Sequence, residues 1–292
     1  MMLESLKGFA TSHFGWIVEK YPEFFAVVKE NLPKADMKIS HRTYASLVIF
    51  ISLILFFLSF FVSIPLLLFF QTSLLLSIFY SFFASLLIAL VCFLVFIFYP
   101  VQKASKRKKD IESNLPFVLT HMSAICETGV PPYMVFKLLS RFKEYGEISR
   151  EMEKIVKSIE ELGTDPLTAV KQVANKTPSE RLKQILLGFV TTIEGGGNIK
   201  VFLKTAGDEA LFEWRIKREK FIQQLSTIAE FYTGILIAAP LFIISLFAVM
   251  NMIQPTLMGF GILDIMKISS YLLVPVINIG FLLFLESVEV SL

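Results

Sequence analysis

The chain has 292 residues, of which 54% are hydrophobic and 30 are phenylalanine, and its mean hydropathy is +0.65. A soluble domain of this length does not need so much apolar surface, whereas apolar runs of 18 or more residues are typical of membrane-spanning helices. The formal net charge of +3 is too small to indicate a nucleic-acid-binding protein, so we expect no nucleic acid among the partners.

Residues 1–43 are predicted to form amphipathic helices on the cytoplasmic side. Apolar residues recur at three- and four-residue steps from Leu3 to Leu32, with charges between them, and Pro33 is predicted to end this pattern. The pattern favours helix packed on the membrane face or on the polar domain that follows. A helix that docks a partner protein is the alternative.

Residues 44–100 are predicted to form a transmembrane hairpin, because the segment from Tyr44 to Tyr99 has no charged residue. Each residue adds about 1.5 Å to a helix, so some 20 residues cross the hydrocarbon and this block fits two tilted spans. Pro65 and the run Gln71-Thr72-Ser73 mark the expected turn between the spans. Cys92 in this block and Cys126 beyond it have such different surroundings that we expect two free thiols.

The orientation follows from basic residues beside the spans. A cluster from Lys103 to Lys109 follows the second span, and Lys217, Arg218 and Lys220 precede the third. Such residues tend to stay on the cytoplasmic side, which predicts a cytoplasmic N-terminus, polar domain and C-terminus. We expect the membrane itself to be the cytoplasmic (inner) membrane. Topology alone explains the first cluster, although binding to acidic lipid or to a partner is a second interpretation.

Residues 101–225 are predicted to form a cytoplasmic helical domain, since 21 of the 28 Lys and Arg residues lie there. Asp165-Pro166 is typical of a helix N-cap followed by proline, and Thr177 with Glu180 is typical of a capping box. Three stretches show the 3.6-residue apolar period of amphipathic helices. They are Ile111, Leu115, Val118, Leu119, Met122 and Ile125; Ile148, Met152, Ile155, Val156, Ile159 and Leu162; and Leu182, Ile185, Leu186, Phe189, Val190 and Ile193.

Three glycines in this domain, Gly129, Gly163 and Gly197, lie 34 residues apart, each between two predicted helices. Glycine just beyond a helix end adopts the left-handed conformation at little cost and lets the chain reverse. The spacing therefore predicts three helix–Gly–helix hairpins and a six-helix bundle. A tetratricopeptide repeat is excluded, because the Trp, Tyr and Ala positions of that repeat are missing.

Residues 226–292 are predicted to form a second transmembrane hairpin, with spans at Thr227–Met252 and Ser269–Leu285 and an outside loop between them. Glu230 lies a few residues inside the cytoplasmic boundary of the third span. An acid buried in the membrane is functional by default, but at this depth Glu230 can also reach water, and both interpretations stay open. The predicted fold class is thus an all-α membrane protein, with four transmembrane helices in two hairpins flanking a cytoplasmic six-helix bundle.

Several short motifs resemble, in their order, those of the type II secretion F-domain family. Members are the membrane platform proteins of type II secretion systems, type IV pili, Tad pili and the archaellum. Asn114-Leu115-Pro116, followed by Thr128-Gly129-Val130-Pro131, resembles the start of the family domain. The segment from Ile193 to Gly197 resembles the family signature Gly-Glu-x-Ser-Gly, with Ile193 for the first glycine and Gly196 for serine. Glu230 and Pro240 also fit, so the resemblance covers about Asn114 to Met252.

The resemblance implies a non-catalytic platform that couples a cytoplasmic hexameric ATPase to the assembly or secretion of pilin-like subunits. A homo-oligomer, or a hetero-oligomer with a related F-domain protein, would present several docking surfaces to such a motor. The alternative is a small transporter or channel subunit with a regulatory cytoplasmic domain. The sequence disfavours this alternative, because solute pathways need broken helices or ionisable groups near the membrane midplane.

No catalytic, cofactor-binding or metal-binding residue is predicted. The sequence has no phosphate-binding G-x-x-x-x-G-K-[ST] motif and no G-x-S-x-G motif, and His13, His41 and His121 lack metal-ligand spacing. We therefore expect a protein that is not an enzyme and has no cofactor.

Charged residues on exposed faces of the bundle are the candidate partner contacts, because an apolar patch there would aggregate the free protein. A solvated surface charge is the ordinary alternative for each of them. The candidates are Arg141, Lys143, Arg150, Arg181, Lys183 and Glu194. Membrane lipid is the other expected contact.

Overall fold

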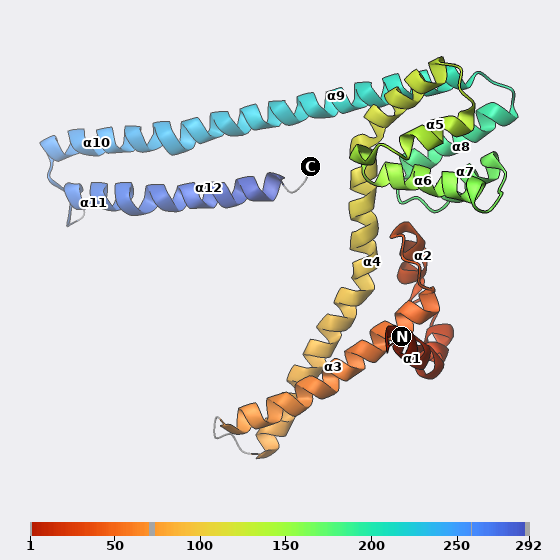
Figure 1. Cartoon of the computed structure of the whole chain (residues 1–292). Helices are drawn as coiled ribbons and strands as arrows, with labels where there is room; N and C mark the ends of the chain where they lie inside the picture. Colours follow the sequence, from red (N-terminus) through yellow and green to blue (C-terminus); the bar gives the residue numbers. More distant parts are fainter. Residues whose placement is uncertain (1, 70–73, 258, 290–292) are drawn as a thin grey trace. The chain divides into compact units, whose positions relative to one another are not determined.

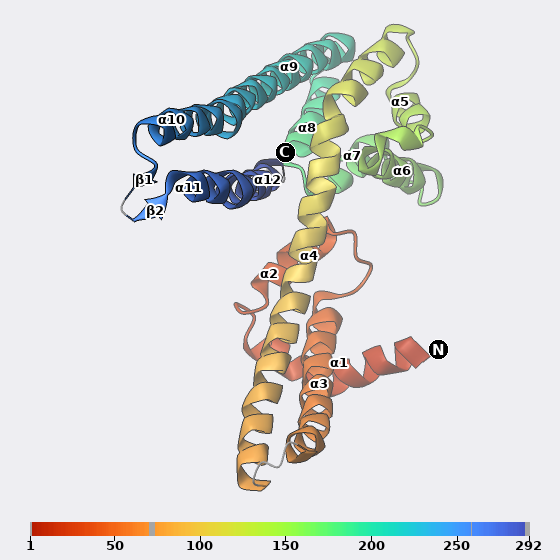
Figure 2. The same cartoon turned by 90° about the vertical axis from the view of Figure 1, so that its left-hand side faces the viewer.

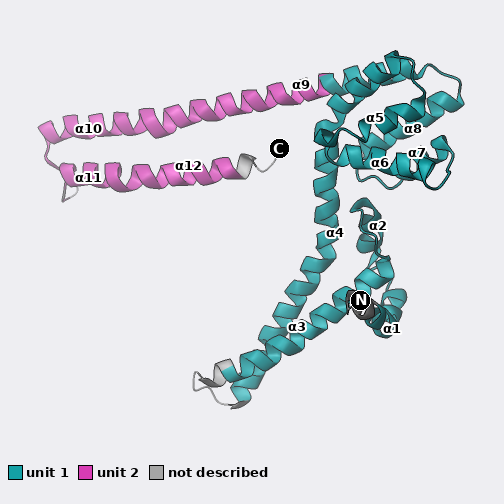
Figure 3. Cartoon of the chain, viewed as in Figure 1, with its two compact units in different colours: residues 1–211 teal, residues 212–292 magenta. Residues whose placement is uncertain are grey.

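The structure is a computed structural model that describes residues 2–69, 74–257 and 259–289 (Figure 1). It divides into two compact units, residues 1–211 and residues 212–292 (Figure 3). Only the long helix α9 (Ile199–Phe231) passes from the first unit into the second.

All regular elements among the described residues of the first unit are helical, with loops between them. Besides the start of α9, its elements are α1 (Met2–Lys20), α2 (Ala26–Lys34), α3 (His41–Phe69), α4 (Leu74–Glu127), α5 (Pro132–Leu139), the 3-10 turn η1 (Lys143–Tyr145), α6 (Glu147–Glu160), α7 (Pro166–Ala174) and α8 (Glu180–Glu194).

The second unit is an antiparallel pair of long helices joined by a short two-stranded turn (Figure 2). In that turn Thr256 pairs with Gly261 and Leu257 with Phe260. After α9, its elements are the π-helical turn η2 (Tyr232–Ala238), α10 (Ala239–Ile253), β1 (Thr256–Leu257), β2 (Phe260–Gly261), α11 (Ile262–Ile268), the π-helical turn η3 (Ser269–Leu273) and α12 (Val274–Glu289).

Four helices are long and apolar enough to cross a membrane, as predicted, so the chain is a multi-pass membrane protein. They lie in His41–Pro65, Leu75–Glu127, Ile199–Ile253 and Ile262–Glu286, with mean hydropathy of the best window between 2.1 and 3.0. The fourth begins at Ile262 and not at the predicted Ser269, because the segment expected to be loop forms α11.

Prolines interrupt these helices less than expected. Pro65, predicted in the first turn, lies inside α3, whereas the other predicted turn residues, Gln71 to Ser73, lie outside the described residues. Pro240 and Pro275 each follow a π-helical turn closely, and the helix continues through both. Proline lacks an N–H and crowds the preceding turn, and the wider π-helical turn accommodates it without a break.

One hydrophobic core unites the polar part of α4, the helices α5 to α8 and the start of α9 (Figure 1). All three predicted apolar stripes face this core, except that Leu162 is 77% exposed because α6 ends two residues before it. The largest fully buried side chains of this core are Phe136, Phe189, Ile111, Leu115, Leu119, Leu139, Ile148, Met152, Ile155, Leu186 and Leu203.

Capping residues set the starts of two bundle helices. Asp165 is the N-cap of α7, as predicted, and its carboxylate accepts a 3.0 Å hydrogen bond from the Thr168 N–H. The N-cap of α8 is Ser179 and not the predicted Thr177, because α8 begins at Glu180 and the Ser179 hydroxyl accepts from the Leu182 N–H.

Left-handed glycines close the first two hairpins, since Gly129 has φ +80° and Gly163 has φ +65°. In the third hairpin the left-handed residue is Gly196, with φ +67°, and not the predicted Gly197. The cause is the end of α8, where the Gly196 N–H bonds to the Ile193 carbonyl and the Gly197 N–H to the Thr192 carbonyl. This is the Schellman pattern, which places the left-handed residue directly after the cap Gly195.

A second, smaller core joins the N-terminal helices to the base of the α3–α4 hairpin. The N-terminal segment forms two helices, α1 and α2, and Pro33 lies in the last turn of α2, one residue before its end. The Tyr44 hydroxyl donates a 2.7 Å hydrogen bond to the Phe96 carbonyl across this core. Its buried members are Val18, Phe25, Val28, Leu32, Tyr44, Ala45, Val48 and Ile97.

The left-handed glycines give the first testable prediction. Replacing Gly163 or Gly196 by alanine should destabilise the full chain by about 1 kcal/mol, because an L side chain is strained at positive φ. An added Cβ meets nothing within 4 Å at either position, so the loss reports the backbone alone. Thermal unfolding in detergent should show a fall of about 2–4 °C.

The matched control is Gly8→Ala. Gly8 lies inside α1, where an added Cβ also meets nothing within 4 Å and φ is not positive. Alanine is favoured there by about 0.5–1 kcal/mol, so the melting temperature should not fall. Wild-type melting of both Gly163→Ala and Gly196→Ala would contradict the left-handed assignment.

Candidate functional site

A buried arginine on α4 forms the centre of the candidate site. Among the basic residues from Lys103 to Lys109, all of which the structure describes, only Arg107 is buried. It lies at the helical spacing between Ala104 and Ile111, which are also buried, so it occupies the core-facing side of α4. This placement forces the guanidinium away from solvent.

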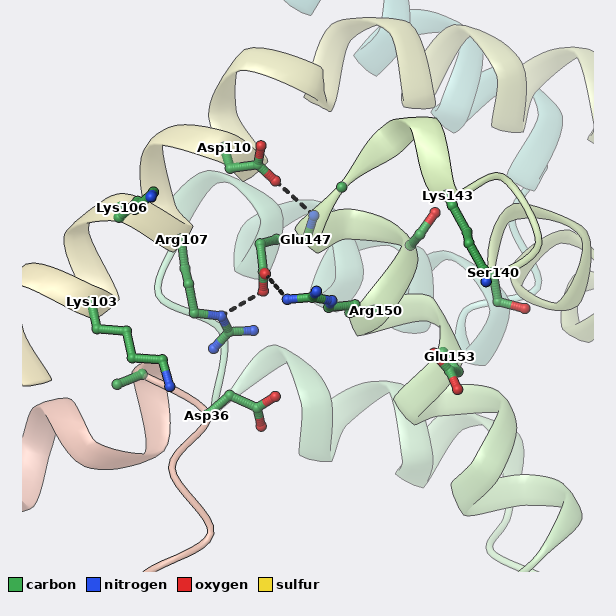
Figure 4. A pocket seen from close by; sticks show the side chains of 13 residues that line it. Asp36, Lys103, Lys106, Arg107, Asp110, Ser140, Lys143, Glu147, Arg150 and Glu153 are labelled. Carbon is green, nitrogen blue, oxygen red and sulfur yellow. Dashed lines mark hydrogen bonds and ion pairs between the residues drawn. The ribbon is translucent and has the colours of Figure 1, made fainter.

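The Arg107 guanidinium donates to three acceptors from two other helices. Nε bonds to Glu147 Oε2 at 2.6 Å and Nη2 to Glu151 Oε1 at 2.5 Å, both on α6. Nη1 bonds to the backbone carbonyl of Lys34 at 2.5 Å, at the end of α2. Figure 4 shows Arg107 and Glu147 pointing toward one another, with Arg150 reaching the same carboxylate.

The charge of Arg107 can be buried because the carboxylates of Glu147 and Glu151 neutralise it, and the same contact compensates the buried Glu151. Glu151 is 1% exposed, and an unpaired charge at such a site would be strongly destabilising. The planar guanidinium supplies donors in a fixed fork, so it satisfies two carboxylates and a carbonyl at once. A lysine, with a compact ammonium, would not span these acceptors in the same way.

The contacts of Arg107 with α6 and α2 form a junction, here called the Arg107 junction, and the end of α2 joins it through Asp36. Asp36 is the one non-glycine residue of positive φ (+54°) in the described chain. The Asp36 N–H bonds to the Pro33 carbonyl and the Met37 N–H to the Leu32 carbonyl, which is again a Schellman pattern. Aspartate here is less favourable than glycine, but its carboxylate lies 2.9 Å from Lys154 Nζ on α6. The ion pair therefore ties α2 to the bundle.

The ionisation of Asp36 reflects these neighbours. Burial raises its pKa, but the hydrogen bond and charge of Lys154, with the charges of Arg107 and Lys38, outweigh burial and hold the pKa below the ordinary value. Asp36 is therefore ionised over the neutral pH range, where its contact with Lys154 is complete.

Gly146 is the N-cap residue of α6 and lies next to α4. Its φ of +56° and ψ of −122° favour glycine, and an added Cβ would collide with the Asp110 carboxylate. Asp110 Oδ2 accepts a 2.6 Å hydrogen bond from the Glu147 N–H, so it serves as a cap supplied by another helix. Only glycine allows α4 to approach the start of α6 this closely.

These elements surround a cavity of about 650 Å³, drawn in Figure 4. Its charged lining consists of five cations and four carboxylates. These are Lys103, Lys106, Arg107, Lys143 and Arg150, and Asp36, Asp110, Glu147 and Glu153.

The structure brings together two of the predicted contact residues, since Lys143 and Arg150 both line this cavity. Arg141 is exposed and is not among the lining residues. On α8, Arg181 is half-buried and Lys183 lies 3.5 Å from Glu180. Their role as partner contacts stays a prediction.

The two predicted acids lie elsewhere. Glu194, in the last turn of α8, forms a 2.6 Å ion pair with Lys171 of α7. Glu230 is exposed on α9 in the second unit. Neither residue lines the cavity, and their proposed roles also stay predictions.

The sequence interpretation missed Arg107, Asp36, Glu147 and Glu151. One signal was present, because Arg107 lies four residues before Ile111 and so extends the first apolar stripe toward the membrane. A charge within an apolar stripe predicts a buried ion that needs a partner. Its partners could not be identified this way, since they lie 40 and 44 residues further along the chain.

Comparison with known proteins identifies part of the chain. Residues 118–247 match the family described as type II secretion system (T2SS), protein F. The match begins within α4 and ends within α10, which confirms the resemblance seen in the motifs.

Three curated relatives are similar over more than half of the chain. An uncharacterized protein of Methanocaldococcus jannaschii is 26% identical over 195 residues, which is 66% of this chain and 33% of the relative. Flagella accessory protein J of Methanococcus voltae is 22% identical over 60% of this chain and 30% of its own length. Flagella accessory protein J of M. jannaschii is 22% identical over 54% and 28%.

The aligned part of this chain thus spans about a third of each of these relatives. No solved structure matches the chain.

The buried arginine gives the second prediction. Arg107→Ala should destabilise the full chain by about 3–5 kcal/mol, because Glu147 and Glu151 then lose a buried partner. Proteolysis should also become faster in the segment 35–40, since the Lys34 carbonyl loses its donor. Thermal unfolding and limited proteolysis in detergent measure the two effects.

Lys108→Ala is the control, because it removes the same charge one residue away. Lys108 is exposed and lies 3.9 Å from Glu112, so its loss should change stability by less than about 1 kcal/mol. Equal melting temperatures for Arg107→Ala and Lys108→Ala would show that the junction does not hold α2.

Proposed function

We propose, from the type II secretion system protein F domain that residues 118–247 form, that the chain is an integral membrane platform protein. It serves a type II secretion or type IV pilus-like machine, of the Tad or archaellum-like kind. It couples a cytoplasmic hexameric ATPase to the assembly or secretion of pilin-type subunits, and it is not itself an enzyme. The family match carries this proposal.

Helix continuity supports the coupling. Helix α4 is an apolar span at its start, and its end contributes Ile111, Leu115 and Leu119 to the bundle core. The helix from Ile199 to Ile253 likewise begins with Leu203 in the core and ends in an apolar span. We infer that a displacement of the bundle is passed along these two paths into the membrane, through α4 and through α9, η2 and α10.

The type of machine is suggested by the relatives. Two of them carry the name flagella accessory protein, which favours an archaellum-like or type IV pilus-like filament over a solute transporter. A homo-oligomer, or a complex with a related F-domain protein, is also part of the proposal, because a hexameric motor presents several equivalent docking surfaces.

The exposed spans are consistent with such partners. Side chains on the second hairpin such as Phe242, Met252 and Tyr271 are at least 80% exposed within the chain itself. Lipid, pilin-like subunits or another platform chain would cover them in the membrane.

The experiment that tests the function is purification of the tagged chain from membranes of its own host. Co-purification of a secretion-type ATPase and pilin-like subunits supports the platform. Solute flux through reconstituted vesicles, with no such partners, would favour the transporter instead.

Orientation gives the third prediction, for a protein of the cytoplasmic membrane with both termini inside. Leu162 is 77% exposed between α6 and α7, and Gln254 is exposed after α10. After Cys92 and Cys126 are replaced by alanine, Leu162→Cys should resist a membrane-impermeant thiol reagent in intact cells. Gln254→Cys should react with the same reagent.

Inverted vesicles provide the control, because the two positions should exchange their reactivity. Reaction of Leu162→Cys in intact cells would overturn the orientation. Gly146, although it lies between helices, is a poor reporter position, since its Cβ would collide with Asp110.

The fourth prediction concerns motor docking through α8. Reversing Arg181 and Lys183 to glutamate should weaken ATPase binding by about tenfold or more, because close charge pairs across an interface contribute on the order of 1.5 kcal/mol or more. Binding is measured with purified chain in nanodiscs, together with filament assembly and membrane insertion in cells.

Lys200→Glu with Lys204→Glu is the matched control, since both lysines are exposed on α9 and the charge change is identical. It should leave ATPase binding near the wild-type value. Wild-type binding by the Arg181 and Lys183 variant would place docking elsewhere, on Arg141, Lys143, Arg150, Glu194 or the N-terminal helices.

A further inference from the structure

Three of the cations that line the cavity beside Arg107 form no ion pair among the described residues. Lys103, Lys106 and Arg107 lie at helical spacing on one face of α4 and line it, and Lys143 lines it from η1. Arg107 is fully engaged by α6 and α2. No ion pair among the described residues reaches Lys103, Lys106 or Lys143.

All four lining carboxylates are already engaged. Asp110 accepts from the Glu147 N–H, and Glu147 binds Arg107 and Arg150. Asp36 pairs with Lys154 at 2.9 Å, and Glu153 with Lys157 at 2.6 Å. Five cations and four carboxylates give the lining a formal charge of +1, and none of the three lysines has an ion-pair partner among the described residues.

The position of the cavity along α4 indicates which kind of anion the lysines meet. The aromatic residues of the span in α4 end at Tyr99, Pro100 follows, and Lys103 is the first charged residue, within one helical turn of Pro100. At about 1.5 Å per residue, Lys103 and Lys106 lie roughly 5–10 Å beyond the end of the apolar span. This is the depth of lipid headgroups, where lysines meet phosphate.

We propose that this cavity binds the phosphate of an anionic phospholipid headgroup, held by Lys103 and Lys106, with Lys143 on the opposite wall. Its volume lies within the range of about 300–1,000 Å³ that is usual for small-molecule sites. Lys103 is half-buried, whereas Lys106 and Lys143 are exposed. The proposal does not depend on the platform function.

A lipid is favoured over an acidic protein segment because the cavity adjoins the membrane and is built by one chain. The rest of the basic cluster behaves differently. Lys108 and Lys109 are exposed and do not line the cavity, so they provide a surface charge of the same size next to it.

The test compares two double variants of the full chain in detergent, Lys103→Gln with Lys106→Gln and Lys108→Gln with Lys109→Gln. The probe is short-chain phosphatidylglycerol, and binding is measured by native mass spectrometry and by thermal shift. Each lysine near anionic lipid contributes about 1 kcal/mol, so the cavity variant should lose about tenfold or more in affinity. The control should stay within about twofold of the wild type.

Three outcomes would overturn the proposal. Equal loss in both double variants would show general attraction to surface charge. Binding of inorganic phosphate as tight as that of the lipid would assign the site to a free ion. An acidic peptide that binds more tightly than the lipid, and only when Lys103 and Lys106 are present, would assign the cavity to a protein partner.

Lys143→Gln supplies a second variant on a different element. It should also weaken binding of phosphatidylglycerol while leaving the melting temperature unchanged, because Lys143 is exposed and makes no ion pair in the described structure. Short-chain phosphatidylcholine should bind at least tenfold more weakly than phosphatidylglycerol to the wild type, and equal binding would also overturn the proposal.

Discussion

The structure depends on α4, because this one helix passes from the hydrocarbon of the membrane into water. The first part of α4 has apolar residues on every side, as hydrocarbon requires, and the part after Pro100 has a single apolar stripe, as a bundle in water requires. The change happens without a break in the backbone. Everything that packs on the polar part of α4, from α5 to the start of α9, is therefore fixed relative to a membrane span.

Arg107 lies near the boundary between these two parts of α4, and its burial determines how α6 and α2 pack beside it. A charge on the core-facing side of α4 needs compensation, and Glu147 and Glu151 supply it from α6 while the Lys34 carbonyl supplies it from α2. These contacts bring the start of α6 against α4, where only Gly146 fits, and they hold the N-terminal helices beside the bundle. The cavity is the space that remains among these charged groups.

Much of this fold was readable in the sequence, because its signals are local. Long apolar runs located the four spans, although the fourth begins before the predicted Ser269, and apolar periodicity located three bundle helices. Asp165-Pro166 marked the start of α7. The left-handed glycine of the third hairpin was assigned to Gly197 instead of Gly196, because the sequence does not show at which residue α8 ends. The Arg107 junction was missed for a different reason, since its partners are distant in sequence and no period relates them.

The junction and the cavity share one face of α4, and this has a thermodynamic consequence. A phosphate held by Lys103 and Lys106 would lie within a turn of Arg107, whose third acceptor is the end of α2. If docking of α2 shapes the cavity wall through Asp36, lipid binding and α2 docking must favour one another by the same free energy. The N-terminal helices would then be held most firmly when the bundle lies against an anionic membrane. A soluble fragment without lipid would lack that contribution.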